Sequence, residues 1–67
     1  MMINRLKGKI TEAGYTQRTL AQKLNMSKNT LNSKVNGKTS FNISEIEALC
    51  AILGITDNSE KAQIFLS

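Results

Sequence analysis

The chain of 67 residues has no proline, no histidine, one cysteine and only 4 % aromatic residues. One cysteine excludes an intrachain disulfide, and the lack of histidine excludes a Cys/His zinc cluster and removes the commonest general acid and base. Scarce aromatic residues argue against a β-sandwich, and no apolar run approaches the ~20 residues of a membrane helix. A lone cysteine in an apolar segment fits a reducing, intracellular compartment. We therefore expect one small cytoplasmic domain that is not an enzyme and binds no metal, cofactor, membrane or small-molecule substrate.

Basic residues outnumber acidic ones, and they are concentrated in the first part of the chain. Residues 1–38 carry eight lysines and arginines against one glutamate, a net charge of +7. Residues 39–67 carry one lysine against four acidic residues, a net charge of −3. Such a basic half favours a polyanionic partner, although an ordinary solvated face is the other interpretation. Because the cations do not line one long amphipathic helix, nucleic acid is a better candidate than a membrane surface.

Apolar residues recur at helical spacing, and short polar breaks separate the runs. Gly14 and Gly54 suit the left-handed residues that end helices. The pattern Ser44-x-x-Glu47 is typical of a capping box at the start of the fourth helix. No segment alternates with period two, so the predicted fold class is all-α. Helices are predicted over about residues 3–13, 17–24, 28–35, 44–53 and 57–63.

The second and third predicted helices, separated by three residues, fit a helix-turn-helix over about residues 17–35. Thr16 and Ser27 are suitable N-caps for the two helices. Ala21 is small enough for a close helix crossing, and Asn25 in the turn tolerates a positive φ. The outer face of the third helix is polar and carries no acid. Its residues are Lys28, Asn29, Asn32 and Ser33.

The stretch QRTLAQKLNMSKNTLNSKVNGK, from Gln17 to Lys38, resembles the lambda-repressor/Cro-like (XRE-type) family of DNA-binding proteins. With Leu53-Gly54-Ile55, the resemblance covers roughly residues 3–57. It implies a compact domain of four to five helices over residues 1–67, whose third helix reads the major groove of double-stranded DNA. Because no sensory or self-cleaving domain follows, we expect a Cro- or repressor-like transcription regulator from a phage or a bacterium.

Two positions depart from the family pattern. Asn25 replaces the usual glycine of the turn, which is acceptable for its backbone. The apolar anchor of the third helix falls at Val35, whereas the family usually has it at the position of Lys34. One residue corresponds to a rotation of about 100° around the helix axis. The departure therefore affects which of the polar residues on the third helix face the DNA.

The expected DNA contacts divide into two groups. Lysine donates to guanine, asparagine pairs with adenine and serine is adaptable, so we assign base contacts to Lys28, Asn29, Asn32 and Ser33. Gln17 and Arg18, where the second helix begins, suit phosphate. The resemblance implies further phosphate contacts from the loop after the third helix, namely Asn36, Lys38, Thr39 and Ser40. Arg5, Lys7 and Lys9 are expected to form a general electrostatic surface, and Cys50 a buried structural thiol.

The end of the chain is apolar at Ile64, Phe65 and Leu66, which either fold back onto the core or meet a second subunit. We favour a homodimer, at least on DNA, since one such domain reads only a few base pairs. One alternative is an antitoxin of this fold that also binds a toxin. Another is a helical adaptor that binds a protein and not DNA, and the basic half argues against it.

Overall fold

The computed structural model describes residues 1–66, which form five helices and no strand. The all-α prediction is therefore confirmed, while residue 67 of the predicted domain lies outside the described residues. No helix within residues 1–66 has the length and apolar character needed to cross a membrane. The helices are α1 (Ile3–Glu12), α2 (Gln17–Lys23), α3 (Lys28–Val35), α4 (Ile43–Leu53) and α5 (Asn58–Phe65).

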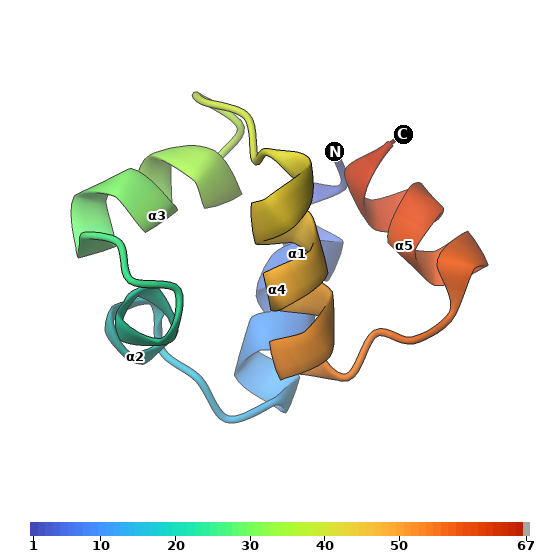
Figure 1. Ribbon diagram of the computed structural model, residues 1–67, viewed down its shortest axis with the longest axis horizontal. Coiled ribbons are helices and arrows are strands. Elements are labelled where there is room, and N and C mark those ends of the chain that lie inside the picture. The colour runs from blue at the N-terminus through green and yellow to red at the C-terminus, as the bar shows by residue number, and fades with distance from the viewer. Residues whose placement is uncertain (67) are drawn as a thin grey trace.

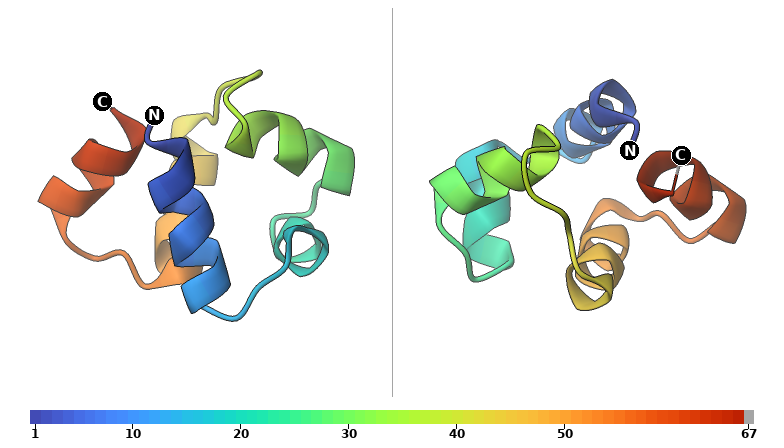
Figure 2. Two further views of the ribbon diagram at one scale, coloured as in Figure 1. Left: turned by 180° about the vertical axis from the view of Figure 1, so that it is seen from behind. Right: turned by 90° about the horizontal axis from the view of Figure 1, so that it is seen from above.

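The helices divide the molecule into two sides with α1 and α4 between them (Figure 1). On one side α2 packs against α3, and on the other lies α5. Helix α1 contacts both α3 and α5, as the further views in Figure 2 also show. The two chain ends meet, because the amide of Met2 donates to the carbonyl oxygen of Ile64 over 2.8 Å. Both sides are thus fixed to the same central helix, α1.

The core receives apolar side chains from all five helices. Two short helices alone bury too little surface to be stable, so the helix-turn-helix depends on α1, α4 and α5 to close over it. Among the described residues no polar or charged side chain is buried. Cys50 is buried as predicted, and burial raises the pKa of its thiol. The buried core consists of Leu6, Ile10, Leu20, Ala21, Leu31, Val35, Leu49, Cys50, Ile55 and Ile64.

Local signals place most helix ends where the sequence predicts them. The hydroxyl of Thr16 accepts the amide of Thr19 at the start of α2, and that of Ser27 accepts the amide of Thr30 at the start of α3. Gly54 ends α4 with a left-handed φ of 72°. These caps satisfy backbone groups that have no partner within a helix.

The predicted capping box of α4, Ser44 with Glu47, is wrong. The helix begins at Ile43, and its cap is Asn42, which has an extended backbone. The side-chain oxygen of Asn42 accepts the Glu45 amide over 2.8 Å, and the Asn42 amide donates to Glu45 Oε1 over 2.9 Å. Asparagine caps a helix as well as serine does, so both registers suited the local sequence. The consequence is that Glu45 lies at the first turn of α4.

Candidate nucleic-acid interface

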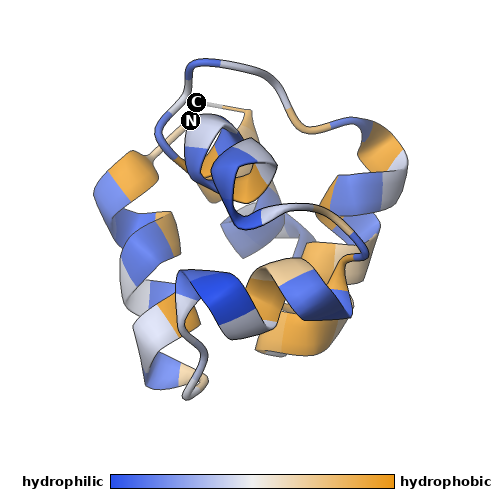
Figure 3. Ribbon diagram, turned by 90° about the vertical axis from the view of Figure 1, so that its left-hand side faces the viewer, coloured by the Kyte–Doolittle hydropathy of each residue, from blue (hydrophilic) through white to orange (hydrophobic). Residues whose placement is uncertain are grey.

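The helix-turn-helix is built around a close crossing of α2 and α3. Ala21, the small residue expected at this crossing, is 2 % exposed. The turn contains Asn25 with φ of 59°, and the amide of Met26 returns to the carbonyl oxygen of Ala21 over 3.0 Å. Figure 3 shows the molecule from this side, where hydrophilic residues predominate on the turns of α2 and α3 that face the viewer. The motif therefore presents a polar surface to solvent.

Two residues of α3 are fully buried, Leu31 and Val35, and they mark the side of the helix that faces the core. Val35 is thus the apolar anchor, and Lys34 is turned aside toward α4. Lys28, Asn29 and Asn32 are exposed, whereas Ser33 is only half-buried. Of the four predicted base contacts, three therefore lie on the open face of the helix and Ser33 lies at its edge.

Asn32 is held by two other predicted site residues. Its side-chain amide donates to Gln17 Oε1 over 2.9 Å, which links α3 to the first residue of α2. The side-chain amide of Asn36 donates to both the Asn32 carbonyl oxygen and Asn32 Oδ1, each over 2.9 Å. The sequence suggested these three residues one by one, and the fold brings them together. A side chain held in this way loses little freedom when it binds a ligand.

The loop after α3 is folded back onto the end of that helix. Gly37 has φ of 79°, a left-handed conformation that favours glycine. The amides of Lys38 and Thr39 both donate to the carbonyl oxygen of Ser33, over 2.9 and 3.3 Å. Lys38, Thr39 and Ser40 remain exposed. The loop therefore presents these polar groups beside α3 in a defined position.

Cations on the two sides of the molecule differ in their partners. Lys9 makes an ion pair of 2.9 Å with Glu60 of α5, and Arg5 lies 4.0 Å from the same carboxylate. Glu60 thus compensates one positive charge of the surface predicted from Arg5, Lys7 and Lys9, most directly that of Lys9. On the helix-turn-helix and its loop, four exposed cations make no ion pair within residues 1–66. They are Arg18, Lys23, Lys28 and Lys38.

The side chain of Lys34 lies between α3 and α4, a position that the sequence did not predict. Its ammonium donates to both oxygens of Glu45, over 2.6 and 2.7 Å, and lies 6.0 Å from the ring centroid of Phe41. The hydrogen bond from Lys34 and then that from the Asn42 amide hold the pKa of Glu45 below its ordinary value, although burial acts in the opposite direction. The sequence contained one indication of this unusual contact, namely that Lys34 stands at a position that is usually apolar in the family.

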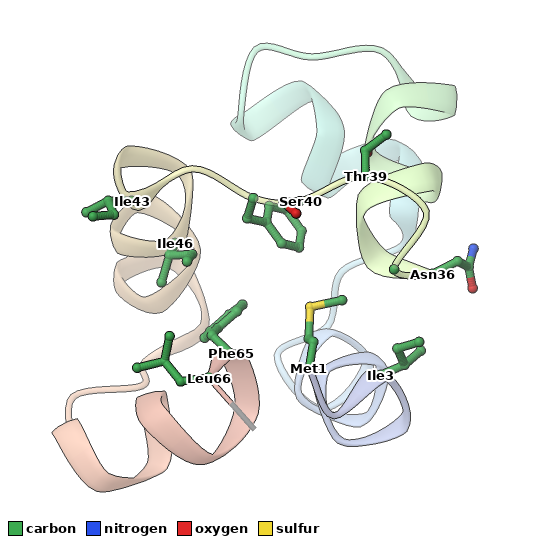
Figure 4. Close-up of a pocket in the computed structure, with 11 residues that line it drawn as sticks. Met1, Ile3, Asn36, Thr39, Ser40, Ile43, Ile46, Phe65 and Leu66 are labelled. Atoms are coloured by element: carbon green, nitrogen blue, oxygen red, sulfur yellow. The ribbon is translucent and has the colours of Figure 1, made fainter.

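A groove of about 650 Å³ lies between the loop after α3, the start of α1 and the end of α5 (Figure 4). The described residues that line it are apolar apart from amide and hydroxyl groups such as those of Asn36, Thr39 and Ser40, and none of their side chains is ionisable. Ile43 and Leu66 border it and are 76 % and 79 % exposed. Within residues 1–66, no group of three or more acidic or cysteine side chains is placed to hold a metal ion.

The family profile described as helix-turn-helix matches residues 6–58, which include α2, α3 and α4 completely. The chain therefore belongs to the XRE/lambda-repressor-like helix-turn-helix family, a family of DNA-binding transcription regulators. This membership confirms the resemblance that was seen between Gln17 and Lys38. No curated protein and no solved structure matches the chain.

Proposed function

We propose that this protein is a sequence-specific regulator that reads the major groove of double-stranded DNA with α3. One observation carries the proposal: the two buried anchors, Leu31 and Val35, leave Lys28, Asn29 and Asn32 together on the open face of α3. The N-terminal part of the second helix of such a motif is the part that meets base edges. The exposed side chains are thus on the part of the helix that reads sequence.

The chemistry of these side chains suits base recognition. Lys28 donates to guanine O6 and N7, and the amides of Asn29 and Asn32 offer the donor and acceptor that adenine N7 and N6 require. The bonds to Gln17 and Asn36 hold the Asn32 amide before DNA arrives. Asn32 therefore gives a more selective contact than a freely rotating side chain at the same place.

Phosphate contacts are proposed on both flanks of α3. Gln17 and Arg18 lie at the start of α2, and the loop that follows α3 lies on the other flank. Groups of this kind position a protein on the duplex without reading its sequence. The loop residues with this role are Asn36, Lys38, Thr39 and Ser40.

We further propose that the protein acts as a homodimer on DNA, with half-sites about one turn (~34 Å) apart. Ile64 has folded back and is fully buried, so it takes no part in the contact. The exposed Ile43 and Leu66 form an apolar patch with Glu47 and Lys61 at its border. A two-fold interface must be complementary to itself, and opposite charges on one border allow Glu47 of one copy to face Lys61 of the other.

In this arrangement the protein is a Cro- or repressor-like regulator of phage or bacterial type. A dimer seated in the major groove of a promoter excludes other proteins from the same base pairs. We expect the protein to be located in the cellular compartment that contains the DNA. The family's regulatory role supports a binding function over an enzymatic one.

Selection of bound duplexes from a random pool tests the proposed reading. The wild-type protein is expected to enrich a two-fold symmetric sequence, and single alanine variants of Lys28, Asn29, Asn32 and Ser33 to change individual positions of it. Because Ser33 is half-buried, its variant should have the smallest effect. If none of the four variants alters the enriched sequence, α3 is not the reader and the proposal fails.

A charge exchange tests the proposed dimer. Glu47→Lys and Lys61→Glu each place like charges across the two-fold interface, so each should weaken cooperative binding to paired half-sites. The double variant restores opposite charges and should recover cooperativity. Glu12→Lys, an exposed acid on α1, is the matched control and should leave cooperativity unchanged. Cooperativity that is not recovered in the double variant would place the dimer contact elsewhere.

A further inference from the structure

The ion pair between Lys34 and Glu45 joins the end of α3 to the beginning of α4. Both carboxylate oxygens of Glu45 accept from the Lys34 ammonium, and Oε1 also accepts the Asn42 amide over 2.9 Å. One carboxylate therefore caps α4 and holds α3 at the same time. The side chains are largely shielded, with 16 % of Lys34 and 21 % of Glu45 exposed.

This geometry separates Lys34 from the cations that are available to DNA. A phosphate ligand needs a side chain that reaches into solvent, as the exposed Lys28 and Lys38 do. The ammonium of Lys34 instead lies between the Glu45 carboxylate and the ring of Phe41, which itself packs edge-on against Phe65 at 6.1 Å. Its contacts are thus with α4 and with the segment that leads into it.

Apolar anchors hold a helix against the core but define its rotation weakly, because dispersion contacts are not directional. A charge-assisted pair with two short hydrogen bonds is directional. On α3 the apolar anchors are Leu31 and Val35, and the directional contact is Lys34 with Glu45. Lys34 itself occupies the position where the family usually has its apolar anchor.

We propose that Lys34 is a positioning residue whose pair with Glu45 sets the rotation of α3, and with it the side chains that α3 presents to the bases. This inference rests on the proposed function, since it concerns the same reading helix. Lys34 itself contacts no DNA in this account. Loss of the pair loosens α3 and also the cap of α4, because Glu45 serves both.

The test compares three variants in binding as salt is varied and in duplex selection. Lys34→Met keeps the length of the side chain and removes its charge. Glu45→Gln removes the pair but keeps an oxygen that accepts the Asn42 amide. Lys38→Met is the matched control, an exposed lysine four residues away that makes no ion pair within residues 1–66. Thermal unfolding followed by circular dichroism verifies that each variant is folded.

Lys34→Met and Glu45→Gln are each expected to lower the ratio of specific to random binding about tenfold, the effect of misplacing one base contact. Lys34→Met should leave the slope of affinity against salt unchanged, whereas Lys38→Met should lower the slope by about one per site and keep the selected sequence. If Lys34→Met does not fold, the test rests on whether Glu45→Gln selects a different DNA sequence from the wild-type protein.

Two results of the DNA-binding experiments would overturn the positioning role, and a third measurement applies if no sequence is selected. A salt slope that falls by about one in Lys34→Met makes Lys34 an ordinary phosphate ligand. Unchanged sequence preference in both pair variants makes the pair a local contact without effect on reading. If the wild-type protein selects no sequence, the proposed function fails, and amide resonances of α3 in the free protein then test positioning alone. Resonances of Asn29 and Asn32 that do not move in Glu45→Gln would reject it.

Discussion

The side of the molecule formed by α2, α3 and the loop to Ser40 differs from the side formed by α5 in how each uses its charges. On the α2–α3 side, exposed lysines and arginines make no ion pair within residues 1–66. On the α5 side, Glu60 holds Lys9 and lies close to Arg5. The first side also exposes amides and hydroxyls, whereas the second exposes the apolar Leu66, which lines one hollow with the exposed Ile43 of α4. The α2–α3 side therefore has the composition of the proposed DNA-binding surface, and the α5 side that of the proposed dimer contact.

This difference shows that charge counted along the chain is not charge on a surface. The basic half of the sequence contains Arg5 and Lys9, but Glu60 from the other half pairs with Lys9, lies near Arg5 and so compensates one of their two charges. Lys34, from the same half, is held by Glu45. The cations left for DNA are therefore fewer than the net charge of the first 38 residues suggests, and most of them lie on the α2–α3 side. They are Arg18, Lys23, Lys28 and Lys38, with Lys7 on α1.

The largest expected effect concerns salt. A dimer that neutralises roughly 6–10 phosphates should lose about 10³–10⁵ in affinity between about 50 and 200 mM salt. Four cations on the α2–α3 side of each protomer agree with that number of contacts. Titration of a labelled duplex at several salt concentrations measures the slope. A helical adaptor with a protein partner would show little salt-dependent binding to duplex or heparin, and such a result would remove the contrast between the two sides.

The next largest effect is on stability, and it should differ between Ile64 and Leu66 at the end of α5. Ile64→Ala empties part of the core and should cost about 2–5 kcal/mol of unfolding free energy. Leu66→Ala changes an exposed side chain and should alter stability by no more than about 0.5 kcal/mol. Urea unfolding measures both. Leu66→Ala should nevertheless weaken binding to paired half-sites, so a fully cooperative Leu66→Ala protein would contradict the proposed patch. Deleting residues 64–67 would combine the two effects, and single substitutions keep them apart.

On the α2–α3 side, substitutions of base-contacting residues should have effects different from those of phosphate-contacting residues. Asn29→Ala and Asn32→Ala are each expected to cost about 1–3 kcal/mol at particular base pairs and to relax preference there. Gln17→Ala should reproduce part of the Asn32 effect, since it removes the bond that orients the Asn32 amide. Affinity for single-base variants of the selected duplex measures each loss. Equal losses on all duplexes would mean that these asparagines contact the backbone only.

A smaller effect compares one cation from each side. Lys38→Ala should weaken specific and random duplexes alike and lower the salt slope by about one per site. Lys9→Ala should leave the slope unchanged, because its ammonium is already paired with Glu60 over 2.9 Å. Both substitutions remove one positive charge, so net charge is matched. Equal slopes for the two variants would show that the α5 side also faces the DNA.

The smallest expected effect is a dependence of stability on pH. The lowered pKa of Glu45 in the folded protein means that its pair with Lys34 stabilises the fold above the ordinary glutamate pKa. This contribution is lost as the pH falls through the lowered pKa. The advantage of the wild-type protein over Glu45→Gln should therefore shrink on acidification and stay within about 1 kcal/mol. Urea unfolding of both proteins between about pH 3 and pH 7 follows it. An advantage that grows on acidification would contradict the lowered pKa.

The candidate site could be predicted from the sequence where its signals are local. The caps Thr16 and Ser27, and the turn at Asn25, depend on residues within a few positions, and all three predictions are confirmed. The anchor at Val35 also agrees with the buried side of α3. The capping box of α4 failed for the same local reason, because two overlapping patterns fit the sequence two residues apart.

What could not be predicted are the contacts between distant side chains. Nothing in the sequence near Gln17 indicates that its side-chain oxygen accepts a hydrogen bond from the side-chain amide of Asn32. The shielded pair of Lys34 and Glu45 depends on where α4 begins, and that start was predicted incorrectly. Such pairs arise only when two helices already stand in the right relation, so no spacing rule reveals them.

By itself the sequence determined the five helices, their family and the polar outer face of α3, since helix period and caps act over one or two turns. Only the tertiary structure decided which cations stay free, that Ile64 enters the core while Leu66 does not, and how α3 is turned. These outcomes depend on which surfaces packing brings together. Charge pairs and buried side chains belong to those surfaces and not to any single segment of the chain.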